Sequence, residues 1–120
     1  MTTALSELTV GEVALEAGVA PSAVRFYERH GLVTAVRTSG NQRRFAASAP
    51  CLIKVAKVAQ RVGLSVREIA DLFAALPADP ARDDWAWVSR TLVDQAQARV
   101  DTLRATLDDL DSDTKLCDLA

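Results

Sequence analysis

The residues 19–45, VAPSAVRFYERHGLVTAVRTSGNQRRF, decide the fold that we predict for this chain. Pro21 stands where a helix can begin without losing a hydrogen bond, and Gly31 stands where that helix, 21–30, would end. Beyond the glycine, two short extended pieces flank the sequence TSGN at 38–41, which is typical of a turn. The stretch therefore predicts a short helix followed by a two-stranded hairpin, or wing.

The segment before this stretch predicts a second short helix. Thr9 and Glu12 form a capping-box pattern, and Gly18 is the expected end of the helix that they open. The residues expected to point inward are Val10, Val13, Ala14 and Ala17. Two short helices joined by a tight, glycine-containing turn are typical of a helix-turn-helix, whose second helix enters the major groove of DNA.

Two more helices are predicted after the wing. Ser48 is expected to cap the first, which ends at Gly63, and its apolar stripe consists of Leu52, Val55, Ala56, Val58, Ala59 and Val62. A second capping box, Ser65 to Glu68, opens the next helix. That helix is expected to bury Ile69, Leu72, Phe73 and Leu76.

The C-terminal part of the chain carries a heptad pattern. Apolar residues recur there at spacings of 3, 4, 3, 4 and 3, namely Val93, Ala96, Val100, Leu103, Leu107 and Leu110. A helix with this one-sided seam is too long to bury against a small domain, so we expect it to pair with a second copy. Trp85 and Trp87, at its start, are expected to pack across that dimer or against the partner's DNA-binding half. The expected division is a winged helix-turn-helix domain with a second helix pair at 1–76, a linker at 77–84, a dimerisation helix at 85–111 and a short tail at 112–120.

Charge separates the two halves of the chain. Residues 21–67 hold nine lysines and arginines and one acid, Glu28, a local net charge of +8 in a chain whose net charge is −2. Such a concentration of positive charge indicates a polyanionic partner, and nucleic acid is the usual one. The residues expected to contact DNA are Ser22, Arg25, Tyr27, Arg37, Asn41, Gln42, Arg43, Arg44 and Lys57. Phe26 is expected in the core, and one of the two adjacent arginines could instead brace the helices, because neighbours on a strand face opposite ways.

Other classes of function lack their required residues. The sequence has no nucleophile–base arrangement, phosphate-binding loop or metal-ligand cluster, which argues against an enzyme. No apolar run approaches the ~18 residues of a membrane span, and the N-terminus lacks signal-peptide features, so we expect a cytoplasmic protein. The two cysteines form no disulfide framework. Cys51 is expected to be buried, whereas Cys117 could form an intermolecular disulfide.

Three motifs carry a resemblance to a known family. TVGEVALEAGVAPSAVRFYERHGLV, RTSGNQRRF and AQRVGLSVREIADLFAALP resemble the MerR family of bacterial transcription regulators, and SGNQRRF and KVAQRVGL look most like its redox-responsive SoxR branch. The resemblance implies a mainly α fold, in which a winged helix-turn-helix domain precedes a long helix that forms an antiparallel coiled coil in the dimer. It also implies a homodimer that binds a palindromic promoter operator and bends and untwists the DNA, so that RNA polymerase can use both promoter elements.

One departure from the SoxR pattern concerns the cofactor. SoxR-like proteins hold a [2Fe–2S] cluster with a CxxCxC…C loop after the dimer helix, and such a cluster needs four thiolates. Here Asp113, Leu116 and Asp118 stand where the first three cysteines belong, and Cys117 is out of register, so no cofactor is expected. Two alternatives therefore remain beside a signal-responsive regulator. One is an architectural repressor without a sensor, and the other is a protein-interaction module that forms heterodimers through the seam.

Overall fold

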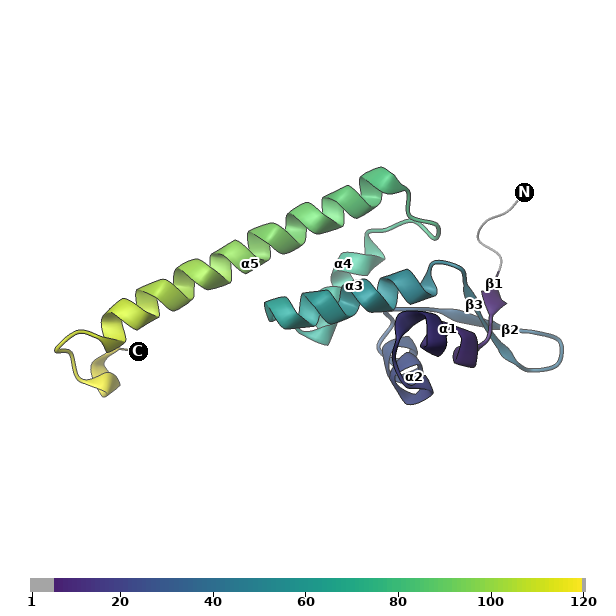
Figure 1. Ribbon diagram of the computed structural model, residues 1–120, viewed down its shortest axis with the longest axis horizontal. Coiled ribbons are helices and arrows are strands. Elements are labelled where there is room, and N and C mark those ends of the chain that lie inside the picture. Colours follow the sequence, from purple (N-terminus) through teal and green to yellow (C-terminus); the bar gives the residue numbers. More distant parts are fainter. Residues whose placement is uncertain (1–5, 120) are drawn as a thin grey trace.

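The computed structural model describes residues 6–119 and is mainly helical, with a long C-terminal helix that projects from a small N-terminal body (Figure 1). The fold class predicted from the sequence is confirmed. The elements in chain order are β1 (Ser6–Leu8), α1 (Val10–Ala17), α2 (Pro21–Arg29), β2 (Ala35–Arg37), β3 (Arg43–Ala46), α3 (Ala49–Val62), α4 (Val66–Ala74), α5 (Arg82–Leu110) and the 3₁₀ turn η1 (Leu116–Asp118).

Helices α1 and α2 form the predicted helix-turn-helix. The Thr9 hydroxyl accepts a hydrogen bond from the Glu12 amide at 3.1 Å, and the Glu12 carboxylate accepts one from the Thr9 amide at 2.8 Å, which is the predicted capping box. Gly18 ends α1 with φ +71°, a left-handed conformation that suits glycine. Helix α2 begins at Pro21 and ends one residue before His30, close to the predicted boundary.

The wing contains the predicted two-stranded hairpin, and a third strand joins its sheet. Strands β2 and β3 pair antiparallel, with Ala35 opposite Phe45, and the turn between them includes Asn41 at φ +62°. Strand β1 pairs with the other edge of β3, so the strand order is β1-β3-β2 and β3 is central. The two-stranded hairpin predicted from the sequence is therefore confirmed, and β1 is an addition that the sequence did not predict. A strand of three residues has too few alternations to carry a recognisable pattern.

Helix α3 has a different buried face from the predicted one. Ile53 is completely buried, whereas Val58, which was assigned to the apolar stripe, is 46% exposed. The reason is that α3 packs against α1, α4 and α5, so that its buried face is broader and rotated from a single stripe. Ser48 precedes the helix as predicted, but its side chain makes no capping bond because its backbone is itself helical.

The core is apolar and joins all the helices. Its largest fully buried side chains are Phe45, Ile53, Ile69, Val13, Val24 and Val88, and no polar residue is buried among those that the structure describes. Helix α4 contributes Ile69, Leu72 and Phe73 as predicted, whereas Leu76 is half-buried. Because Val88 and Leu92 come from α5, the first part of the long helix belongs to the N-terminal body.

Helix α5 leaves the body beyond Arg99. It begins at Arg82, earlier than the predicted residue 85, because Asp84 accepts a hydrogen bond from the Ala81 amide at 2.8 Å. Trp85 is half-buried and packs against the core of its own chain, and Trp87 is exposed. The Arg99 guanidinium donates to the Gly63 carbonyl at 3.3 Å and lies 3.9 Å from the Glu68 carboxylate. Arg99 thus fastens α5 to the turn between α3 and α4.

The two capping boxes predict how stability depends on pH. Backbone hydrogen bonds from Thr9 and Ser65 hold the pKa values of Glu12 and Glu68 below their ordinary value. Because the folded pKa is the lower one, this stabilisation is present above the ordinary glutamate pKa and is lost as pH falls through the folded pKa. We expect the urea midpoint of unfolding to fall on acidification. The fall should be shallower in the double variant Glu12→Gln, Glu68→Gln, which keeps the acceptors but does not titrate. Equal slopes for the two proteins would contradict this origin.

Candidate nucleic-acid interface

Helix α2 presents an exposed basic and polar surface. Ser22 and Arg25 are both exposed, and no side chain caps the start of the helix. The Ala23 and Val24 amides donate to the Ala20 carbonyl and Pro21 has no N–H, so in the first turn the Ser22 amide is the one left for an outside acceptor. An amide at a helix N-terminus with a nearby guanidinium suits a phosphate oxygen. The surface of α2 can therefore meet both the backbone and the base edges of a duplex.

Tyr27 is more deeply buried than Phe26, which corrects the prediction that the Tyr27 ring faces DNA, and Phe26 packs half-buried against the core. The Tyr27 ring is buried, with 6% exposure, and its hydroxyl donates a hydrogen bond to the Gln60 side chain of α3 at 2.8 Å. Burial raises the pKa of the Tyr27 phenol. Phe26, expected in the core, is only half-buried and stacks on His30, with ring centroids 4.5 Å apart. The Tyr27 ring is thus part of the core, and Gln60, which no sequence pattern marked, fixes its hydroxyl.

The wing turn places three predicted contact residues together in solvent. Arg37, Asn41 and Gln42 are all exposed. The Arg37 guanidinium donates to the Asn41 carbonyl at 3.1 Å, and the Gln42 amide donates to the Thr38 hydroxyl at 3.3 Å. These bonds brace the turn from within, so its donors are held near one another before any partner binds.

The adjacent arginines Arg43 and Arg44 bond to different partners. The Arg43 guanidinium forms an ion pair with Glu28 of α2 at 3.0 Å and is half-buried, so this arginine braces the wing against the helix as the alternation of strand faces suggested. Arg44 faces the other way, donates to the Gln42 side chain at 2.9 Å and helps to lower the pKa of Glu12 on α1. Arg43 therefore ties the wing to α2, whereas Arg44 bonds within the wing itself.

Helix α3 extends the positive surface. Lys57 is exposed, and so are Lys54 and Arg61 on the same helix. Residues 21–67 carry the excess of positive charge, and the structure describes all of them. Their exposed cations lie on α2, the wing and α3, except Arg67, which lies on α4.

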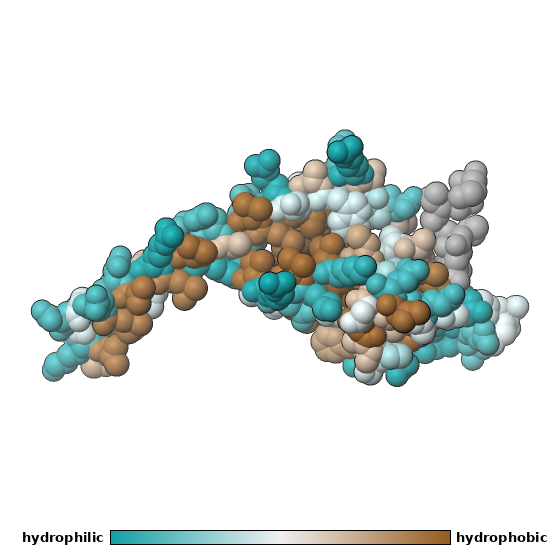
Figure 2. Space-filling view, viewed as in Figure 1, coloured by the Kyte–Doolittle hydropathy of each residue, from teal (hydrophilic) through white to brown (hydrophobic). Residues whose placement is uncertain are grey.

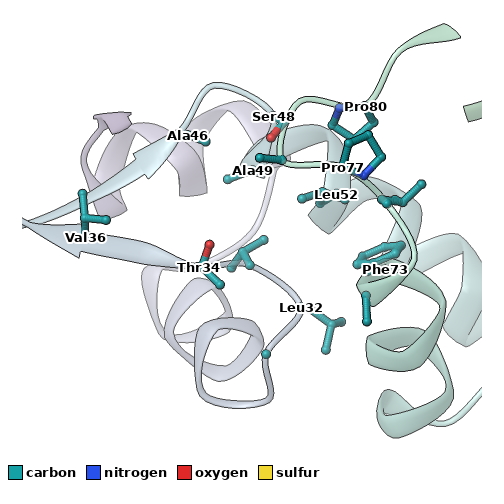
Figure 3. A pocket seen from close by; sticks show the side chains of 15 residues that line it. Leu32, Thr34, Val36, Ala46, Ser48, Ala49, Leu52, Phe73, Pro77 and Pro80 are labelled. Atoms are coloured by element: carbon teal, nitrogen blue, oxygen red, sulfur yellow. The ribbon is translucent and has the colours of Figure 1, made fainter. Parts of the chain in front are cut away.

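A cavity of about 400 Å³ lies behind the wing (Figure 3). Leu32, Val36, Leu52 and Phe73 contribute to its wall, and Pro77 closes it from the segment that leads to α5. No charged side chain lines it, so it is separate from the basic surface. The cavity therefore lies between the wing and the segment that connects α4 to α5.

The residues present do not fit an iron–sulfur cluster. The sequence holds two cysteines where four thiolates are required, and they lie far apart, on α3 and in η1. Among residues 6–119, no three His, Cys, Asp or Glu side chains come close enough to hold a metal ion. Cys51 is exposed, which corrects the prediction that it is buried.

The helices that the structure describes include none that is both long and apolar enough to cross a membrane. Even the longest, α5, carries charged residues throughout its length.

Two family models match the chain. Residues 9–45 match the model described as MerR family regulatory protein, and residues 52–112 match the model described as MerR, DNA binding. The first covers the helix-turn-helix and most of the wing, and the second covers α4, α5 and most of α3.

Curated relatives point the same way. An HTH-type transcriptional activator SoxR homolog from Chromobacterium violaceum is 39% identical over 109 residues, which is 89% of this chain and 74% of that protein. A mercuric resistance operon regulatory protein from Shigella flexneri is 41% identical over 69 residues, 57% of this chain and 48% of that protein. The match thus spans about half the length of the mercuric resistance regulator.

Two solved structures have the same fold. A structure assigned to the MerR family of transcriptional regulators, from Listeria monocytogenes, superposes with a TM-score of 0.60 and 26% identity, covering 88% of this chain and 81% of that one. HiNmlR, described as a MerR family regulator lacking the sensor domain and bound to promoter DNA, superposes with a TM-score of 0.57 and 18% identity, covering 89% and 86%.

Proposed function

The chain belongs to the MerR family of DNA-binding transcriptional regulators, and from this premise we propose that it binds a palindromic promoter operator as a homodimer. It is a regulator and not an enzyme. In the proposed complex, α2 enters the major groove, the wing contacts the neighbouring backbone, and α5 joins the two subunits.

The observation that carries the proposal is the set of exposed cations on α2 and the wing. Arg25 on α2 and Arg37 at the wing are both exposed, and an ion pair between Arg43 and Glu28 connects β3 to α2. Two elements held rigidly can address a groove and its flanking phosphates together. Preorganisation of this kind lowers the entropic cost of binding.

The exposed seam on α5 supports the homodimer. Leu103, Leu107 and Leu110 are 68%, 64% and 53% exposed in the single chain, which is unusual for leucine at consecutive helical turns. A twofold dimer would present two copies of α2, and each would meet one half of a palindrome.

We further propose that the dimer controls transcription by bending and untwisting the promoter, with RNA polymerase as the enzyme that reads the result. Deforming a short DNA site costs on the order of 1–6 kcal/mol. A change of a few kcal/mol in the protein is therefore enough to switch the promoter between two shapes. Support for this step comes from the long helix α5 with its exposed apolar seam, because pairing two copies of it would join two DNA-binding units in one dimer.

The test is operator binding by variants of exposed arginines. We expect Arg25→Ala to weaken binding to a selected operator by about 1–3 kcal/mol, because Arg25 reaches base edges or phosphate. We expect Arg37→Ala to weaken binding to all sequences alike and to reduce the slope of log affinity against log salt by about one unit. Gel shifts or fluorescence anisotropy over a range of salt concentrations measure both effects.

The matched control is Arg90→Ala. Arg90 is an exposed arginine on α5, outside the basic surface, so its loss should leave operator affinity and salt slope unchanged. Equal behaviour of the Arg25, Arg37 and Arg90 variants would refute the proposed interface. An alternative is a repressor without a sensor, which is favoured because the residues present do not fit an iron–sulfur cluster. The same assay distinguishes this alternative from a signal-responsive regulator, because a repressor without a sensor would bind DNA identically under every redox and metal condition.

A further inference from the structure

An apolar groove lies between α3 and the first part of α5. It has a volume of about 400 Å³ and is lined by Cys51, Lys54, Val55, Val58, Trp85, Val88, Ser89 and Leu92. Figure 2 shows the hydrophobic side chains of the projecting arm along the edge that faces the N-terminal body, continuing into the hollow between arm and body. The groove is thus an unfilled continuation of the apolar side of α5.

The seam of α5 has a symmetry that selects how a second copy would pair. Its spacings of 3, 4, 3, 4 and 3 read the same in both directions. In an antiparallel pair centred between Val100 and Leu103, Val93 faces the partner's Leu110, and every other seam residue also faces an apolar partner.

The same antiparallel register brings opposite charges together. The end of α5 and the tail carry exposed carboxylates at Asp108, Asp109, Asp111, Asp113 and Asp118. Helix α3, beside the first part of α5, carries exposed Lys54, Lys57 and Arg61. Antiparallel pairing sets the acidic end of one subunit beside the basic helix of the other, whereas parallel pairing sets the two acidic ends together.

Extended by one turn, this register leads into the groove. Ser89 stands four residues before Val93 and lines the groove, and the same symmetry sets it opposite the partner's Thr114. At 1.5 Å per residue, Ser89 lies about 19 Å from the centre of the pair and Leu110 about 13 Å from it. The partner's residues 111–118, which turn back after α5, therefore begin just short of the groove (Figure 1).

We propose that this groove receives the turn Leu116–Asp118 of a second copy, with Leu116 in the apolar slot and the partner's Cys117 against Cys51. Leu116 is 71% exposed in the single chain, and Cys51 and Cys117 are both exposed and free. Asp118 of the partner subunit would lie near Lys54, which supplies the charge that the groove otherwise lacks. This inference rests on the homodimer proposed above.

The arrangement creates an intersubunit redox site for a peroxide. One cysteine thiolate attacks hydrogen peroxide and becomes a sulfenic acid, and the oxygen that leaves becomes water after it takes a proton. The second thiolate attacks that sulfur, the S–S bond forms, and the sulfenic oxygen departs as a second water. Two thiols are oxidised and one peroxide is reduced. The disulfide requires the two Cα atoms to come within about 4.4–6.8 Å, which the docked turn would provide.

The experiment uses the native cysteines as reporters. Purified protein is treated with hydrogen peroxide and run on a denaturing gel without reductant, and the linked peptides are identified by mass spectrometry. We expect the wild type to run as a covalent dimer, and Cys51→Ser and Cys117→Ser each to run as monomers. The decisive sample is a co-expressed mixture of the two variants. Neither chain alone holds both thiols, yet their heterodimer should restore the link through one Cys51–Cys117 pair.

Light scattering on the untreated protein separates the possible failures. A dimer that gives no Cys51–Cys117 link, or that links only like residues, overturns the docking and leaves the homodimer standing. A monomer contradicts the proposed function itself.

A second variant tests the apolar slot independently of the thiols. Leu116→Asp should slow cross-linking at least several-fold, whereas Lys115→Asp, next to it and also exposed, should slow it less, and equal rates for the two would overturn the role of Leu116.

Discussion

Replacing Leu103 by aspartate is expected to convert the dimer into monomers and, with that, to remove tight operator binding. Leu103 is 68% exposed in the single chain and sits at the centre of the seam, where the proposed pairing buries it against the partner's Val100. Losing its burial costs about 2 kcal/mol in each subunit. The two copies together weaken the dimer by about 4 kcal/mol, a thousandfold rise in its dissociation constant.

Analytical ultracentrifugation measures this change, and gel shifts with a full palindrome and with a half-site measure its consequence. The full palindrome should lose its advantage over the half-site, because a monomer carries one α2. The control is Thr102→Asp, which adds the same carboxylate to the neighbouring position outside the seam. If both variants stayed dimeric, the seam would not be the contact between subunits.

Replacing Phe45 by alanine is expected to unfold the N-terminal body or to leave it barely stable. Phe45 is completely buried and lies on the central strand β3, opposite Ala35 on β2 and Leu8 on β1. Removing a buried phenylalanine ring costs about 3–5 kcal/mol, because the cavity left behind adds to the lost transfer energy. Since a domain of this size has a total stability of roughly 5–10 kcal/mol, between about a third and all of it would be lost.

Thermal unfolding followed by circular dichroism measures the effect. A loss of 3 kcal/mol lowers the midpoint by at least about 10 °C in a domain of under 100 residues. Val36→Ala is the control on the adjacent strand β2, since Val36 is 57% exposed and its loss should change stability by no more than about 0.5 kcal/mol. Equal shifts for the two variants would mean that β3 does not anchor the wing to the core.

The elements that the sequence predicted well are those set by local chemistry. Thr9 with Glu12 and Ser65 with Glu68 form the predicted capping boxes, and Gly18 and Gly63 end helices in the left-handed conformation. Each of these signals depends on a few adjacent residues, so no distant contact is needed to interpret it.

The features that the sequence did not predict depend on contacts between distant residues. Strand β1 exists only because β3 offers it an edge, and Ile53 is buried only because α3 is covered from several sides. Tyr27 turns inward because Gln60, far away in the sequence, accepts its hydroxyl. Amphipathic patterns indicate which residues could lie at the surface or in the core. Tertiary packing decides which of two adjacent aromatic rings is buried.

The contact between Arg99 and the α3–α4 turn defines the point about which the free part of α5 can tilt. The Arg99 side chain packs closely on the turn at Gly63, where a Cβ would come within 2.8 Å of the arginine Nε. The contact between α5 and this turn is therefore tight. The part of α5 beyond Arg99 ends at Leu110 and so measures about 17 Å at 1.5 Å per residue. Tilting this part by about 12° about Arg99 would displace Leu110 by about 3.4 Å, the axial rise of one base pair. A small rotation at the contact between Arg99 and the α3–α4 turn is therefore enough to shift the end of α5 by the spacing of neighbouring base pairs.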